Sequence, residues 1–226
     1  MPKLIHSCFV KDEEHCIAMM LESVLPYVEE SYIVIDDRTI DSTEEIAKSY
    51  GCHTKRVKFE NFGKLKNNLM YWIRDKADWS FGLAADELIT PSFGYELKHI
   101  VNKIHTTDVD GVYFSRRHWR DLEMNIEVKG NERDLKGESE WYPDWQQRLL
   151  RIDYPRIHAV RYVHEVIVGV RKSIYVQNDI HHFNTYWKPK LGFNWNEMLL
   201  FYEKLKLQQT IESGSNIWPD EELMEE

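Results

Sequence analysis

Acidic side chains gather at three points of the sequence, each directly after a run of apolar residues. The groups are Lys11 to Glu13, Asp36 to Asp41, and Asp86 with Glu87. A hard divalent cation such as Mg²⁺ or Mn²⁺ takes few protein carboxylates and completes its shell with phosphate oxygens. Carboxylates also accept hydrogen bonds from the base or ribose of a nucleotide. The alternative is that Asp41, Ser42 or the Asp86 pair only caps a following helix.

The first half of the chain alternates strand-like runs with amphipathic segments. This alternation predicts right-handed crossovers and a mainly parallel sheet that helices cover on both faces. Ligands of such sheets bind beyond the carboxyl ends of the strands, where all three acidic groups are expected. The expected strands cover residues 4–10, 31–35, 53–57 and 79–85, and the expected helices begin near residues 17, 44, 64 and 93.

The second half predicts shorter strands, a long loop and a final helix. Residues 121–140 are polar and rich in turn formers, which indicates a loop or hairpin. Residues 193–207 indicate an amphipathic helix, packed on the domain or across a dimer, and residues 220–226 form an acidic tail. Further strands are expected over residues 112–115, 145–152, 163–170 and 173–176.

The pattern as a whole predicts an α/β protein with a smaller mixed β region and a C-terminal helix. One domain is expected over residues 1–190, with a nucleotide half at about 1–110 and an acceptor half at about 111–190. Residues 191–226 form the C-terminal helix and tail.

The composition is that of an ordinary globular protein. The chain has 226 residues, of which 42% are hydrophobic and 30% charged, and this excludes a disordered protein. No apolar stretch approaches about 20 residues, and the start does not resemble a signal peptide. The three cysteines show no disulfide or metal-ligand spacing. We therefore expect a cytoplasmic protein, and leave open a peripheral contact with a membrane.

The formal net charge of -9 gives no general affinity for polyanions and weakens the case for a nucleic-acid partner. A local basic group over residues 116–120 could still meet phosphates, or lie as a solvated strand edge. The oligomeric state is left open.

Taken in order, the motifs resemble the family 2 glycosyltransferases, in particular the bacterial branch that includes lipopolysaccharide-core glucosyltransferases. That family ends its first strand in Val-Lys-Asn-Glu, its second in Asp-Thr-Gly-Ser-Thr-Asp and its fourth in Asp-Ala-Asp-Glu. This chain has Val10-Lys11-Asp12-Glu13, Asp36-Asp37-Arg38-Thr39-Ile40-Asp41 and Ala84-Ala85-Asp86-Glu87. Residues 62–67, 141–149 and 163–165 also match family habits, so the resemblance covers about residues 4–182.

The resemblance implies the GT-A fold and a nucleotide-diphosphate sugar as donor substrate. Asp86 would hold Mn²⁺ or Mg²⁺, helped by Glu87 or by a histidine, either His164 or one of His181 and His182. The donor would be bound by Val10, Lys11, Glu13, Asp36, Asp37, Lys66 and Ala85.

By the same resemblance, the reaction is an inverting transfer of a sugar to a hydroxyl acceptor. Asp144 is the expected base, because it lies in the segment of the family's catalytic acid, between Trp141 and Trp145. The alternative is that Asp144 starts a turn after Pro143. Glu165 is the second candidate for the base.

Two positions depart from the family's pattern. Ala84 stands where the family has the first acid of Asp-x-Asp, so that metal binding must depend on Asp86. Arg38 replaces a glycine and puts a cation near the expected donor.

Three alternatives follow for the function. The loss of an acid at Ala84 allows a catalytically impaired module that only binds nucleotide sugar. The acceptor is expected to be a glycan, and a protein or a modified base in nucleic acid are the alternatives. Nucleotidyl transfer is less favoured, because residues 11–14 lack the Gly-rich phosphate loop of those enzymes.

Overall fold

The computed structural model describes residues 1–128, 142–153 and 156–213. Its centre is an eight-stranded sheet with the order β3-β2-β1-β4-β7-β6-β10-β5. β7 and β5 run antiparallel to the neighbours with which they pair, and the other pairings are parallel. The strands are β1 (Leu4–Val10), β2 (Glu30–Asp36), β3 (His53–Val57), β4 (Trp79–Gly82), β5 (Glu87–Leu88), β6 (Gly111–His118), β7 (Gln146–Arg151) and β10 (Ser173–His182).

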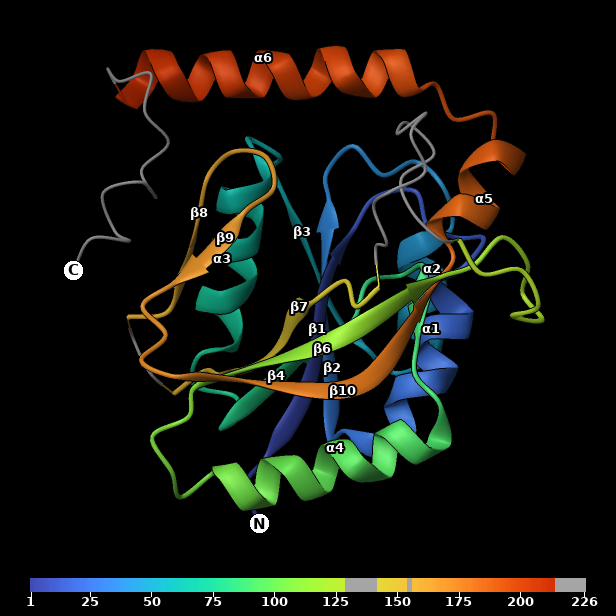
Figure 1. Cartoon of the computed structure of the whole chain (residues 1–226). Coiled ribbons are helices and arrows are strands. Elements are labelled where there is room, and N and C mark those ends of the chain that lie inside the picture. Colours follow the sequence, from blue (N-terminus) through green and yellow to red (C-terminus); the bar gives the residue numbers. More distant parts are fainter. Residues whose placement is uncertain (129–141, 154–155, 214–226) are drawn as a thin grey trace.

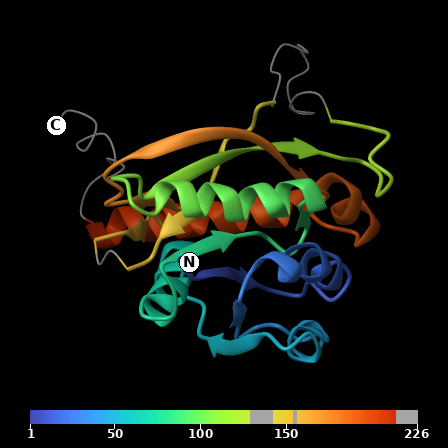
Figure 2. The same ribbon diagram turned by 90° about the horizontal axis from the view of Figure 1, so that it is seen from below.

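Helices cover both faces of the sheet, as the alternating pattern predicts (Figures 1 and 2). α1 (Ile17–Val24), α2 (Thr43–Ser49), the 3₁₀ turn η1 (Leu25–Tyr27) and α4 (Pro91–Ile104) contribute to one apolar cluster. α3 (Phe62–Ile73) lies on the opposite face and packs through a separate apolar cluster. The mainly parallel sheet between two helical layers confirms the predicted fold class.

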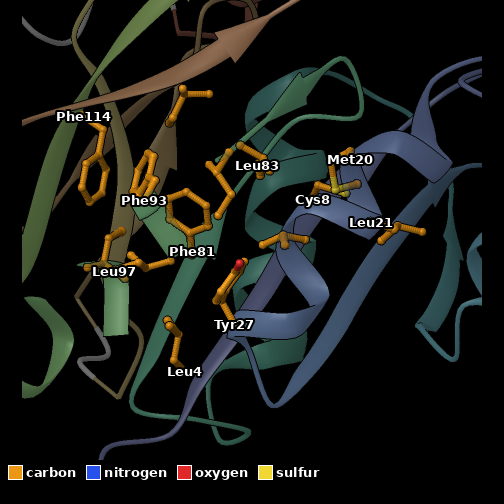
Figure 3. Packing of buried hydrophobic residues seen from close by; sticks show 14 of the residues in the cluster. Leu4, Cys8, Met20, Leu21, Tyr27, Phe81, Leu83, Phe93, Leu97 and Phe114 are labelled. Carbon is orange, nitrogen blue, oxygen red and sulfur yellow. The ribbon is translucent and has the colours of Figure 1, made fainter. Parts of the chain in front are cut away.

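The larger cluster contains three aromatic rings from three elements that lie close together (Figure 3). Phe81 of β4 lies 5.8 Å from Phe93 of α4, and Phe93 lies 4.9 Å from Phe114 of β6, measured between ring centroids. All three side chains are buried. Their packing joins the N-terminal strands to β6, so the two halves of the chain share one core.

The C-terminal part contains one strand and one helix that the sequence did not predict, at residues 158–160 and 184–190, whereas the strand predicted over residues 163–170 is present at 166–168. A short ribbon of β8 (His158–Val160) and β9 (Val166–Val168) lies beside α3, and α5 (Asn184–Lys190) follows β10. The ribbon has only three residues in each strand, which is too short for a clear alternation of polar and apolar residues. α5 contains Pro189 and no buried residue, so it has no amphipathic pattern.

The final helix, α6 (Trp195–Ser213), lies across the end of the sheet to which the parallel strands point (Figure 1). Phe201 packs against Phe59 and Phe62, with ring centroids 5.9 and 6.3 Å apart. Leu205 is its buried residue. Of the two packings expected for this helix, the structure therefore shows the one against its own domain.

Some predictions concern residues outside the described ranges. Most of the loop over 121–140, Trp141 and the acidic tail belong to this group. Within the described part of the chain, no helix is long and apolar enough to cross a membrane.

Candidate active site

The loops that follow β1 and β2 are joined by hydrogen bonds. The backbone N–H of Glu13 donates to the Thr43 hydroxyl over 2.7 Å, and that of Glu14 donates to Asp41 Oδ2 over 3.0 Å. The other oxygen of Asp41 accepts from the backbone N–H of Thr43 at 3.0 Å, so Asp41 also supports the start of α2. The first two acidic groups therefore meet at one edge of the sheet, as predicted.

Asp86 brings the third acidic group to the same edge. It lies in the turn between β4 and β5 and is partly buried, with 20% of its side chain exposed. The pKa of Glu13 is raised to about 8. Burial is the main cause, and the negative charge of Asp86 is the second. The following helix is capped by Thr90, which accepts from the Phe93 N–H, so Asp86 and Glu87 do not cap it.

Glu13 also lies in a small cluster with His15 and Cys16. The ligand atoms of these three side chains all lie within 4.8 Å of one another. The Cys16 thiol donates to Glu13 Oε2 over 3.2 Å, and burial followed by the charge of Glu13 raises its pKa. Because metals bind the thiolate and not the thiol, this cluster suits a shared proton better than a cation.

His182 is the side chain that the structure places against Asp86. Its Nε2 lies 3.1 Å from Asp86 Oδ2, and its Nδ1 lies 2.9 Å from Nδ1 of His118. His118 Nε2 in turn lies 2.9 Å from Asp144 Oδ2. Two imidazole rings therefore connect the carboxylate after β4 with the carboxylate before β7.

This chain of contacts has one proton too few when both histidines are neutral. If His118 donates from Nε2 to Asp144, then His182 donates from Nδ1 to His118, and its Nε2 lone pair faces the Asp86 carboxylate. If instead His182 donates from Nε2 to Asp86 and His118 donates from Nδ1 to His182, the Nε2 lone pair of His118 faces the Asp144 carboxylate. An additional proton on one of the rings, or a cation bound by both acceptors of that contact, resolves the conflict. An imidazole nitrogen and a carboxylate oxygen on facing sides are a donor set that Mn²⁺ accepts, so the residues fit the implied metal.

Asp86 is ionised in this environment. Burial alone would raise its pKa, but His182, followed by Arg116 and Lys188, brings it below its usual range. The carboxylate is therefore available to a cation at all pH values near neutrality.

Asp144 is held by donors on both oxygens. Oδ2 accepts from Arg116 Nε at 2.7 Å and contacts His118, and Oδ1 accepts from Gln146 at 2.7 Å. Burial opposes ionisation, but His118 and Arg116 lower the pKa of Asp144 below its usual range. These contacts make Asp144 a weak proton acceptor and a good partner for His118.

Glu87 is fully buried, and both of its oxygens have protein donors. Oε1 accepts from Arg116 at 3.0 Å and from Arg148, and Oε2 accepts from the Ala84 N–H at 2.9 Å. Metal binding by Glu87 stays a prediction, and this environment does not favour it, because a cation would have to displace two guanidinium groups.

Lys66 and Glu165 form an ion pair that lines a cavity of about 140 Å³, with Nζ and Oε1 3.3 Å apart. The cavity lies between α3 and the sheet, and Ala84 and Arg148 also line it. Burial lowers the pKa of Lys66. Lys66 and Glu165 therefore border the same hollow as the strand end that leads to Asp86.

His164 lies against α6, whereas the histidine in contact with Asp86 is His182. The His164 ring contacts Tyr202, with centroids 5.4 Å apart. The sequence offered three histidines as helpers for the metal, and the geometry favours His182 over His164.

The remaining predicted donor-binding residues lie at the ends of β1 and β2 or, for Ala85, in the turn after β4. Val10 and Ala85 are buried, and Lys11 pairs with Asp12 at the surface. Asp37 Oδ1 accepts from the Phe59 N–H at 3.0 Å. Both oxygens of Asp36 accept hydrogen bonds from the Arg38 side chain.

Two arginines of the basic group over residues 116–120 are engaged by carboxylates, whereas Arg120 is exposed. Arg116 bonds Glu87 and Asp144, and Arg117 pairs with Asp179 at 2.5 Å and with Glu127 at 2.7 Å.

The link through His118 was not found from the sequence. His118 and Arg116 are two residues apart on β6, so alternation puts them on one face of the sheet. The available signal was the polar ending of an otherwise apolar strand. This polar ending indicates a site only when the sheet order is known, because β10 pairs with β6 and brings His182 opposite His118.

Comparisons with known proteins support the fold. No protein-family profile matches the chain, and no curated protein sequence matches it. Among solved structures, S. aureus TarS is similar over 80% of this chain and 36% of its own, at 12% identity and a TM-score of 0.54. Glucosyl-3-phosphoglycerate synthase from Mycobacterium tuberculosis, in complex with Mn²⁺, UDP and glucosyl-3-phosphoglycerate, is similar over 51% of this chain and 44% of its own, at 17% identity and a TM-score of 0.43.

The chain thus spans less than half of either solved protein. At 12% identity, the likeness to TarS concerns the fold alone. The architecture, a mainly parallel sheet between helical layers with a mixed second half, is that of the predicted GT-A fold.

Proposed function

We propose that the protein is a metal-assisted glycosyltransferase that moves a sugar from a nucleotide-diphosphate donor to a hydroxyl acceptor. The observation that carries the proposal is the pair formed by Asp86 Oδ2 and His182 Nε2, 3.1 Å apart at the carboxyl edge of the sheet. Ligands of open α/β sheets bind at this edge. The acidic motifs that resemble the family 2 glycosyltransferases meet here as well.

In the proposed site, Asp86 and His182 hold Mn²⁺ or Mg²⁺. When bound, the cation neutralises the charge that develops on the departing diphosphate. Lys188 adds positive charge near Asp86 and Glu13, since it lowers the pKa of both carboxyl groups. Lys66 is a further cation near the strand ends and would face the donor from α3.

His118 and Asp144 would orient His182 towards the cation. A carboxylate that accepts a hydrogen bond from a histidine fixes its tautomer, and a metal-binding histidine usually has such a partner. Here the partner of His182 is a second imidazole, which Asp144 holds in turn. We therefore assign a positioning role to Asp144.

The base that takes the proton of the acceptor hydroxyl is then better placed at Glu165 than at Asp144. Glu165 forms an ion pair with Lys66, which a substrate can rearrange, whereas Asp144 has donors on both oxygens. Attack of the hydroxyl on the far side of the anomeric carbon would invert its configuration.

A neutral or mildly charged glycan is the acceptor that the charges favour. The net charge of -9 repels polyanions, and Arg116 and Arg117 are engaged by carboxylates. This weakens the alternative of a modified base in nucleic acid.

The second candidate is an inactive module that only binds nucleotide sugar, which the alanine at position 84 favours. Turnover of nucleotide sugars separates the two. Each of a panel of nucleotide sugars is incubated with the protein, with and without Mn²⁺, and release of nucleoside diphosphate is measured. We expect Mn²⁺-dependent release that Asp86→Ala abolishes. Binding without any release would favour the inactive module, and neither binding nor release would contradict both.

A further inference from the structure

Arg38 occupies the end of β2, where the sequence predicts that Asp36 binds the nucleotide. Asp36 Oδ1 accepts from Arg38 Nε and from its backbone N–H, both at 2.9 Å, and Oδ2 accepts from Nη2 at 2.6 Å. Only 2% of Asp36 is exposed. Its carboxylate is therefore covered by Arg38 and does not present an acceptor to an incoming base.

The guanidinium of Arg38 lies over the ring of Phe59, and the ring of Phe201 on α6 is close by. The central carbon of the guanidinium lies 3.7 Å from the centroid of the Phe59 ring and 5.8 Å from that of Phe201. Stacking of this kind fixes the plane of the group, while 41% of the side chain stays exposed. The end of β2 thus carries a rigid, accessible guanidinium.

The accessible edge of this group offers donors only. Asp36 uses one N–H of Nε and one of Nη2, which leaves the hydrogens of Nη1 and the second hydrogen of Nη2 on the outer side. A planar pair of donors matches a ligand with two adjacent acceptors, and a lone-pair acceptor for a base N–H is missing from this edge.

The nucleobases differ in this respect. Guanine presents O6 and N7 side by side and is the base that arginine contacts most often through two hydrogen bonds. Adenine has an amino group beside N7. Uracil has an N–H between its two carbonyl oxygens. Cytosine has adjacent acceptors, but one of them lies next to the ribose.

We propose that Arg38 selects the base of the donor, and that the site prefers a guanosine diphosphate over uridine and adenosine diphosphates. The proposal rests on the proposed function, because it assumes that a nucleotide binds at the carboxyl edge of the sheet. It deepens that function by assigning base recognition to one side chain.

Calorimetric titration of the whole chain with GDP, UDP, ADP and CDP, each with Mn²⁺, tests the proposal. We expect GDP to bind about tenfold or more tightly than UDP and ADP. Arg38→Ala should weaken GDP binding by a similar factor and leave UDP binding nearly unchanged, since the diphosphate contacts are common to all. Lys172→Ala, which removes an exposed ion pair with Asp108, is the matched control and should leave all affinities unchanged.

Arg38→Ala leaves Asp36 buried without its partner and can fail to fold, so Arg38→Lys is measured as well. Lysine keeps a cation beside Asp36 but lacks the planar fork, and we expect it to lose the preference for GDP. Equal or tighter binding of UDP, ADP or CDP by the wild type would overturn the proposal, as would a GDP preference that persists in Arg38→Lys. Absence of binding by every nucleotide would instead contradict the proposed function itself.

Discussion

At the scale of single residues, the central feature is a set of carboxyl groups with opposite pKa shifts. Asp86 and Asp144 are held ionised by histidine and arginine, whereas burial and the charge of Asp86 keep Glu13 protonated at neutral pH. Such a division between neighbouring acids is typical of functional sites. It comes from partners that lie far apart in the sequence.

The shift at Glu13 predicts a pH dependence of stability. A carboxyl group whose pKa is raised to about 8 on folding stabilises the folded state below about pH 4.5, and this contribution is lost as the pH rises to 8. Glu13→Gln removes the titration. In EDTA, we expect the free energy of unfolding of the wild type to fall relative to Glu13→Gln by about 1 kcal/mol per pH unit over this interval.

Urea denaturation at several pH values between 5 and 9 measures this difference. Parallel pH profiles of the two proteins would show that Glu13 is ionised in the folded state. Glu14→Gln, at a neighbouring acid outside the Cys16 cluster, is the control for the loss of one charge.

The two candidate bases predict different kinetic defects. Glu165→Gln should lower kcat for sugar transfer by about 10²- to 10⁴-fold with little change in the Mn²⁺ requirement, because only proton transfer is lost. Asp144→Asn should weaken Mn²⁺ by about 10- to 100-fold, because it disturbs the orientation of His118 and His182. Asp179→Asn, which loses a comparable ion pair with Arg117, serves as control.

Initial rates at varied Mn²⁺ concentration separate these effects. A loss of kcat in Asp144→Asn at saturating Mn²⁺, with full activity in Glu165→Gln, would return the role of base to Asp144.

At the scale of elements, α3 depends on a close approach of two backbones. A Cβ added at Gly63 would lie 2.2 Å from the carbonyl oxygen of Arg161, and the Phe62 N–H already donates to Tyr162 O at 3.1 Å. Gly63→Ala must push apart α3, which carries Lys66, and the segment that leads to Glu165. We expect a loss of about 1–3 kcal/mol in the free energy of unfolding and weaker donor binding.

Asn68→Ala on the exposed side of the same helix is the control, and it should not destabilise the protein. Chemical denaturation and calorimetry measure the two effects. Unchanged stability in Gly63→Ala would show that α3 and the Arg161 segment do not pack this closely.

The elements also show what the sequence could predict. β1 and β3 have the predicted bounds. The apolar run of β1 is buried, whereas β3 is polar, mostly exposed and pairs with β2 at the edge of the sheet. β4 stops at Gly82 instead of residue 85, since Leu83 to Asp86 form the turn into β5. β10 continues to His182, well beyond the predicted end at residue 176. Its polar second half gives no strand pattern, and a register shift after Val176 interrupts the alternation. The missed half of β10 is the part that carries His182.

At the scale of the whole molecule, the charges predict the kind of acceptor. The chain has a net charge of -9, and Arg116 and Arg117 are paired with acids. We expect no measurable binding of duplex or single-stranded DNA at about 50 mM salt, where electrostatic binding would be strong. Fluorescence anisotropy with labelled oligonucleotides measures DNA binding. Binding that weakens steeply with salt would contradict the expectation and favour a nucleic-acid acceptor.

The carboxyl edge of the sheet was predictable as the place of the site, because three acidic groups follow three strands in a repeating pattern. The choice of His182 among the three candidate histidines was not, because Asp86 meets His182 across 96 positions of the chain. The order of the motifs in the sequence predicts which residues follow the strands. Which of these side chains face each other depends on the order of the strands in the sheet.

Binding of Mn²⁺ tests the account most directly. Free Mn²⁺ is followed by electron paramagnetic resonance during titration of the wild type, Asp86→Ala and His182→Ala, each with saturating nucleoside diphosphate. The account predicts that the wild type binds one Mn²⁺ together with the nucleotide, and that both variants weaken this binding by tenfold or more, about 1.4 kcal/mol. Wild-type affinity for Mn²⁺ in Asp86→Ala would contradict it.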